Sequence, residues 1–129
     1  FEQVLIPGAA PVDLRNVVNG VIDWRFRTGV TYRLDDWAAG VTANYANGYR
    51  DNVTLPNRDV DAQTTWDLRL ARTWRQRDSD AAGLQLSLNV INALDEDPPF
   101  VNNPTGYAFD ASNASPLGRI VSLELRQRW

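Results

Sequence analysis

Hydrophobic and polar residues alternate in five segments of the chain, and the alternation is clearest at its C-terminal end. Val121, Leu123 and Leu125 fall at every second position with Trp129 in phase, and the positions between them hold Ser, Glu and Arg. A period of two residues predicts a β-strand with one apolar and one polar face. A final aromatic residue in register with such a strand is typical of a membrane β-barrel, because Trp favours the boundary between water and lipid.

The same alternation predicts four earlier strands, and the connections between the strands differ in length. The predicted strands cover residues 23–34, 37–49, 64–75, 84–94 and 119–129. Short polar turns are expected at 35–36 and 76–83, and long loops rich in Pro, Gly, Asn and Asp at 4–20, 50–63 and 95–118. Long and short connections that alternate are typical of an up-and-down barrel, with turns on one side and loops on the other. The fold class predicted is therefore all-β, an antiparallel up-and-down transmembrane β-barrel segment.

The aromatic residues of these strands fall at two levels. If the last strand runs toward the side with short turns, Trp24, Tyr45, Tyr49 and Trp66 lie near the long loops, and Tyr32, Trp37, Trp74 and Trp129 lie near the turns. Positions 24 and 32 are eight residues apart, as are positions 66 and 74, and this separation corresponds to a height of about 20 Å in a tilted strand, close to the apolar band of an outer-membrane barrel. We interpret the eight aromatic residues as two lipid-facing girdles.

A soluble β-sandwich is the alternative, because its strands also alternate and its turns recur at similar spacing. This alternative predicts a soluble all-β ligand- or carbohydrate-binding module, with Trp66 and Trp74 packed on one interior face. The polar faces hold Arg and Asp side chains, which suit a wet lumen and open solvent equally. The two aromatic levels favour the barrel, since a sandwich core gives no reason for Trp residues at strand ends.

Several stretches resemble one family, the TonB-dependent outer-membrane receptors. The run Val-Ser-Leu-Glu-Leu-Arg-Gln-Arg-Trp at 121–129 is similar to the closing strand of these receptors, and 86–107 and 110–119 to their penultimate strand and last loop. Segments 45–51 and 60–68 resemble the family in the expected order. Asn92-Ala-Leu94 departs from the more usual Asn-Leu-Phe, with no consequence expected beyond packing.

The resemblance implies a role in transport. Residues 1–129 would be the C-terminal part of the receptor barrel, about five strands of a larger, 22-stranded barrel whose lumen is plugged. The N-terminal plug, the earlier strands and the segment that binds the TonB complex would belong to the absent part of the same chain. Such a receptor sits in the bacterial outer membrane, contacts its lipid, and imports a scarce nutrient such as a siderophore or an oligosaccharide with TonB-transduced energy. Its C-terminus would be periplasmic, and Val121, Leu123, Leu125 and Trp129 would form the signal read by the barrel-assembly machinery.

Composition removes several other functions. The chain has 129 residues without Cys, His or Met, and all its basic residues are Arg. Without Cys the chain has no thiolate ligand for a metal, and without His it lacks the commonest general base. We therefore expect no enzymatic activity, no cofactor and no metal site. The Arg residues are dispersed and the net charge is −3, which argues against nucleic acid. Because Met is absent, we expect an excised or mature piece of a longer chain.

The acidic clusters are interpreted as structural. Asp95-Glu-Asp97 lacks the glycine and distal Glu of a calcium loop, and we expect it to end a strand before Pro98-Pro99. Asp35-Asp36 is expected to form a hairpin turn, and Asp59 and Asp61 to be solvated loop charges, with ligand contact as the alternative. Arg25, Arg27, Arg33 and Arg69 would face the lumen, where they line the substrate path, hold the plug or pair with Asp across strands.

Overall fold

The computed structural model describes residues 2–3, 12–76, 79–102 and 106–128, and every regular element in this part of the chain is a β-strand. The all-β prediction is confirmed. The strands are β1 (Glu2–Gln3), β2 (Val12–Asp13), β3 (Arg25–Leu34), β4 (Trp37–Ala46), β5 (Tyr49–Asp51), β6 (Arg58–Val60), β7 (Gln63–Gln76), β8 (Ser79–Ile91) and β9 (Ile120–Arg128). No helix in the described residues is both long and apolar enough to cross a membrane.

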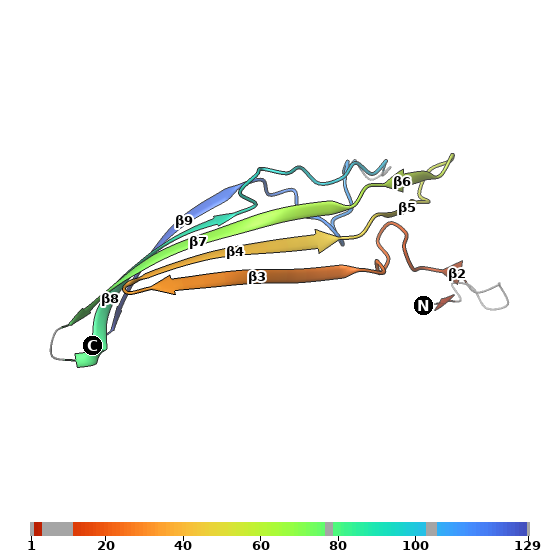
Figure 1. Ribbon diagram of the computed structural model, residues 1–129. Helices are drawn as coiled ribbons and strands as arrows, with labels where there is room; N and C mark the ends of the chain where they lie inside the picture. Colours follow the sequence, from red (N-terminus) through yellow and green to blue (C-terminus); the bar gives the residue numbers. More distant parts are fainter. Residues whose placement is uncertain (1, 4–11, 77–78, 103–105, 129) are drawn as a thin grey trace. The chain divides into compact units, whose positions relative to one another are not determined.

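Five of these strands form one open antiparallel sheet in the order β3-β4-β7-β8-β9 (Figure 1). Each long strand lies beside the next long strand of the chain, so the up-and-down order predicted from the connections is confirmed. β3 and β9 occupy the two edges of the sheet within the described residues. The turn after β3 and the start of β8 therefore lie at the same end of the sheet, and β9 runs back toward that end.

Register places residues of one kind opposite each other. Leu70 pairs with Leu88 across β7 and β8, and Leu88 pairs with Leu123 across β8 and β9. On the other face, Ala71 pairs with Ser87 and Ser87 with Glu124. Since side chains in paired positions point to the same face, the alternation of each strand continues across its neighbours.

Several predicted strand boundaries were wrong. The predicted turn at 76–83 is shorter, because β7 continues to Gln76 and β8 begins at Ser79 with these two residues paired. The register shifts between the Arg75–Gly83 pair and the Gln76–Ser79 pair, so the strand pairing is irregular where the apolar alternation has stopped. The fourth strand ends at Ile91, because Asn92 adopts a left-handed conformation with φ of 51°. The second strand ends at Ala46, and Tyr49 belongs to the separate strand β5.

The chain divides into two compact units. We call Phe1–Phe26, Tyr45–Gln63 and Asp97–Pro116 the loop unit, and Arg27–Asn44, Thr64–Glu96 and Leu117–Trp129 the sheet unit. The sheet unit contains most of the five-stranded sheet. The loop unit contains most of what was predicted to be three separate polar loops.

The loop unit has regular structure that the polar composition of its segments did not predict. β5 and β6 form a hairpin in which Tyr49 pairs with Val60, and the segment around Val17 runs parallel to β5. The backbone N–H of Arg50 donates to the carbonyl of Asn16 at 2.9 Å. A small core lies between these segments, and its buried members are Val18, Ile22, Tyr49, Val60 and Val101, with Ala46 packed against them.

Candidate functional site

One side of the five-stranded sheet exposes large apolar residues. We call this side the apolar face. Its members in the sheet unit have exposed fractions between 36% and 77%, and they are Val30, Tyr32, Leu34, Trp37, Val41, Trp66, Leu68, Leu70, Trp74, Leu84, Leu88, Val121, Leu123 and Leu125. A contiguous apolar surface of this extent marks a site that contacts a membrane or another protein.

The opposite side, which we call the polar face, holds a hydrogen-bond network centred on Asp67 of β7. Its Oδ2 accepts from Arg27 at 3.3 Å and from the side-chain amide of Asn44 at 3.0 Å. Its Oδ1 accepts from the backbone N–H of Asn92 at 3.1 Å. Arg27 therefore pairs with an Asp on another strand of the same face. Pairing with Asp across strands was one of the three interpretations given for the Arg residues.

Small side chains on the polar face are more deeply buried than the large residues opposite them. Ala71 is 2% exposed and Ser87 is 1% exposed, and Ser87 Oγ accepts from Arg69 at 3.3 Å. A hollow of about 500 Å³ lies over this face, and the residues that line it include Thr31, Gly40, Thr42, Asn89 and Ser122. The lining draws on all five strands, so the polar face is continuous across the sheet.

The structure places most of the predicted girdle residues at exposed positions. Trp37 begins β4, and Tyr32 and Trp74 each lie two residues before the end of a strand. Trp66 is 39% exposed near the start of β7, and Trp24, which immediately precedes β3, is 70% exposed in the loop unit. These five residues therefore fall at the strand ends that their sequence positions indicated.

Tyr45 and Tyr49 differ from that description. Tyr45 is half-buried, stacks on Phe26 with 4.9 Å between ring centroids, and donates from its hydroxyl to Asn47 at 3.1 Å. Tyr49 is 9% exposed in the core of the loop unit, which does not fit the lipid-facing position expected for it. Burial and the nearby Asp110 carboxylate raise the pKa of the Tyr49 phenol far above its usual range. From the sequence alone, an aromatic residue just beyond a strand can belong to a girdle or to the core of a loop, and the alternation does not distinguish the two.

The proposed assembly signal lies on an edge strand. Val121, Leu123 and Leu125 of β9 are 62%, 69% and 67% exposed. Trp129, the fourth member, lies outside the described residues. β9 uses one edge for pairing with β8 from Ile120 to Arg128, and its other edge has no strand beside it in the described part of the chain.

Two buried aspartates hold the loop unit together. Asp51 is 2% exposed and accepts from the backbone N–H groups of Val53 at 3.1 Å and Asn102 at 2.9 Å. Asp110 is 1% exposed and accepts from the backbone of Asn19 at 3.0 Å and from the Asn113 amide at 2.8 Å. Buried carboxylates that accept backbone N–H groups of other segments fix those segments in place. Sequence reasoning missed both residues, and an isolated Asp in a polar loop carries no signal that would find them.

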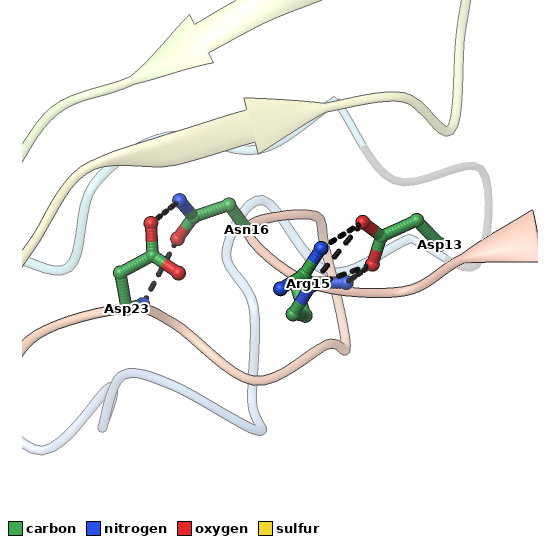
Figure 2. A network of polar contacts seen from close by, with 4 residues as sticks. All are labelled: Asp13, Arg15, Asn16 and Asp23. Carbon is green, nitrogen blue, oxygen red and sulfur yellow. Dashed lines mark hydrogen bonds and ion pairs between the residues drawn. The ribbon is translucent and has the colours of Figure 1, made fainter. Parts of the chain in front are cut away.

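A polar network near the start of the loop unit fixes the approach to β3 (Figure 2). The Arg15 guanidinium and backbone N–H both donate to Asp13, with Nη2 at 2.7 Å from Oδ2, and they hold the pKa of the Asp13 carboxyl well below its usual range. Asn16 exchanges two hydrogen bonds with Asp23, donating to its carboxylate and accepting from its backbone N–H. Position 20, between Asn16 and Asp23, requires glycine, because a Cβ there would lie 2.1 Å from the carbonyl oxygen of Leu14.

A hollow of about 620 Å³ opens in the loop unit. Both signs of charge border it, from Arg15 and Arg50 and from Asp59 and Asp61. The two aspartates predicted to be solvated loop charges therefore border a concave surface. Among the described residues, no group of three or more acidic, His or Cys side chains is arranged to hold a metal ion.

The remaining acidic clusters have structural contacts. Asp95 accepts from the backbone N–H of Arg119 at 2.6 Å and from its guanidinium at 3.4 Å, so the pKa of this carboxyl is lowered chiefly by the backbone hydrogen bond. This contact joins the two ends of the long loop 95–118. Asp35 has φ of 49° in the tight turn between β3 and β4, as expected for a hairpin turn.

Four apolar residues distinguish the open sheet from a closed sandwich. In a sandwich Trp24, Leu68, Leu88 and Leu123 would be buried against one another, whereas they are 70%, 42%, 39% and 69% exposed. Because these side chains are exposed, the apolar face is available for contact with a membrane. Comparisons of the chain with models of protein families, with curated proteins and with solved structures found no match.

Proposed function

We propose that this chain forms part of the wall of an outer-membrane transport barrel, of the TonB-dependent receptor class, that imports a scarce nutrient. The observation that carries the proposal is the two-faced sheet: among the described side chains, fourteen large apolar residues are exposed on one face, and a hydrogen-bonded polar face lies opposite them. In hydrocarbon the apolar face needs no covering, and every backbone group of a spanning strand must be paired. The up-and-down order satisfies that pairing for the interior strands β4, β7 and β8.

In this proposal the apolar face contacts outer-membrane lipid, and the polar face lines a lumen occupied by a plug. The Arg27–Asp67 pair and the neighbouring amides then belong to the lumen wall. The open edges of β3 and β9 pair with further strands of the barrel, since an unpaired edge in lipid leaves backbone N–H and carbonyl groups unsatisfied. β9 also presents Val121, Leu123 and Leu125 to the assembly machinery.

The loop unit is built mainly from the long connections, which in such a receptor face the cell exterior. We propose that it takes part in ligand capture through the hollow bordered by Arg50, Asp59 and Asp61. Side chains of both charges at this hollow suit a polar solute. The buried Asp51 and Asp110 give the unit a fixed framework, which reduces the ordering cost of binding.

Quenching of Trp fluorescence by brominated lipid tests the proposal. The full-length polypeptide is folded into vesicles, and single-Trp variants that keep only Trp66 or Trp74 are compared, with Phe in place of the others. We expect both residues to be quenched by bromines near the headgroup more than by bromines at the centre of the bilayer, because both lie at strand ends. A soluble module, in contrast, gives no quenching by any brominated lipid, and that result would overturn the proposal.

A further inference from the structure

Arg72 is the one basic residue that interrupts the apolar side of β7. It occupies the phase of Leu68, Leu70 and Trp74, whereas Arg69 points to the polar face. Its guanidinium carbon lies 4.9 Å from the ring centroid of Trp74 and 5.1 Å from that of Trp37 on the adjacent strand β4. Two indole rings therefore hold a cation in place on a face whose other members are mostly apolar.

The hydrogen-bonding capacity of this guanidinium is not used by the described residues. Its Nε is buried and has no hydrogen-bond partner, and no ion pair to Arg72 occurs in the described part of the chain. No Asp or Glu occupies the same face among the described side chains of the five strands, because the carboxylates of β7 and β9, Asp67 and Glu124, are on the polar face. Rings stabilise a cation but supply no acceptor for its N–H groups.

The position of Arg72 along the strand fits a headgroup. Its neighbour Thr73 donates from the backbone to the carbonyl of Asp36, in the turn between β3 and β4, at 2.8 Å. Arg72 therefore lies at the end of the sheet where the short connections are. In a membrane-spanning sheet that end is at the interface, where Trp residues gather and lipid phosphates lie.

We propose that Arg72, clamped by Trp37 and Trp74, binds the phosphodiester of an anionic phospholipid. This inference rests on the proposed function, since it requires the apolar face to lie in lipid. The terminal N–H groups of the planar guanidinium, rather than the buried Nε, donate to the phosphate oxygens, and the two rings limit the rotamers that binding has to select. The occupant is an anionic lipid because a zwitterionic headgroup carries its own ammonium group, which competes for the phosphate.

Native mass spectrometry of the full-length polypeptide in non-ionic detergent tests the site. The probes are phosphatidylglycerol and phosphatidylcholine with the same acyl chains. The variants are Arg72→Gln and Arg72→Lys, with Arg33→Gln as a charge-matched control. Arg33 lies near the same turn, but its position in the alternation of β3 places it on the polar face. We expect Arg72→Gln to weaken phosphatidylglycerol binding roughly tenfold, Arg72→Lys to fall between it and the wild type, and Arg33→Gln to bind as the wild type.

The other outcomes of this experiment separate the lipid site from its alternatives. Equal binding of phosphatidylglycerol by the wild type and Arg72→Gln overturns the inference, as does equal binding of phosphatidylcholine and phosphatidylglycerol by the wild type. Inorganic phosphate added in excess should leave the lipid adducts intact, and their displacement would show a site for free anions. If the single-Trp variants are quenched by brominated lipid while Arg72→Gln changes nothing, the inference fails and the proposed function stands; absence of quenching removes both.

Discussion

Asp67 Oδ1 accepts the backbone N–H of Asn92 at 3.1 Å, so a side chain on β7 satisfies the backbone of the residue that follows β8. The other oxygen of the same carboxylate accepts from Arg27 of β3 and from Asn44 of β4. One carboxylate thus connects four successive strands of the meander on their polar face. Its side chain is 17% exposed, which limits how well water can replace these partners.

Replacement of Asp67 should lower the free energy of unfolding. We expect a loss of roughly 1–3 kcal/mol for Asp67→Ala, because the partly buried N–H of Asn92 loses its acceptor and the Asn44 amide keeps only its bond to Thr65. Asp67→Asn should lose less, since one acceptor oxygen remains. Equilibrium urea unfolding in lipid vesicles measures both. The control is Glu124→Gln, whose pair with Arg126 is exposed, and it should change stability by less than about 0.5 kcal/mol.

Asn92 itself should be hard to replace. It is 6% exposed with φ of 51°, its amide donates to the Glu96 carbonyl at 2.9 Å, and its side-chain oxygen accepts the Glu96 backbone N–H at 3.0 Å. Asn92→Ala loses both bonds and keeps a left-handed backbone, for a cost of about 2–4 kcal/mol. Asn92→Gly loses the bonds without the conformational cost and should be less destabilising by about 1 kcal/mol. Equal losses in the two variants would contradict the contribution of the left-handed backbone.

The same unfolding measurement supplies a control for that comparison. Asn52 is an exposed residue of the loop unit, and Asn52→Ala should leave the unfolding midpoint unchanged. A large change of the midpoint in Asn52→Ala would show that removal of any Asn side chain destabilises the protein, and that the effect is not specific to the strand end at Asn92.

Tyr49 should make the loop unit sensitive to alkali. Its phenol has a pKa raised above the ordinary value of 10.0, first by burial and then by the Asp110 carboxylate. The folded state therefore holds the proton more tightly than the unfolded state, and stability present below pH 10 falls as the pH rises above it. The rate of limited proteolysis within the loop unit, measured as a function of pH, reports this loss of stability. In Tyr49→Phe the decline in that range should disappear, with a modest loss at neutral pH from the missing hydroxyl contact.

How much the sequence predicts differs between the two units. Period-two alternation located all five strands of the sheet, because residues such as Leu70, Leu88 and Leu123 face one environment across neighbouring strands. The order of the strands was predicted from the alternating long and short connections. The strand end at Asn92 was misplaced, since apolar residues continue in phase beyond a left-handed turn. The loop unit was not predicted as a unit. Its structure depends on long-range hydrogen bonds to Asp51 and Asp110, and a single polar residue carries no periodic signal.

The start of β9 should depend on Asp95 more than on the side chain of its partner. The largest cause of the lowered Asp95 pKa is the hydrogen bond from the Arg119 backbone, and the guanidinium follows. A lowered pKa means that the contact stabilises the folded chain above the ordinary carboxyl pKa of 3.8 and loses this effect as the pH falls through the lower folded value. Hydrogen exchange at the Arg119 amide should therefore be slow at neutral pH and should lose its protection in acid.

Three variants separate the backbone contact from the ion pair. Asp95→Ala should abolish protection of the Arg119 amide at neutral pH, whereas Arg119→Gln should retain most of it, because its backbone N–H still reaches the carboxylate. Gly118→Ala should resemble Asp95→Ala, since a Cβ at this position would lie 2.7 Å from Asp95 Oδ1 and force the carboxylate away. If Arg119→Gln exposed the amide as much as Asp95→Ala, the guanidinium rather than the backbone N–H would be the dominant partner of the Asp95 carboxylate.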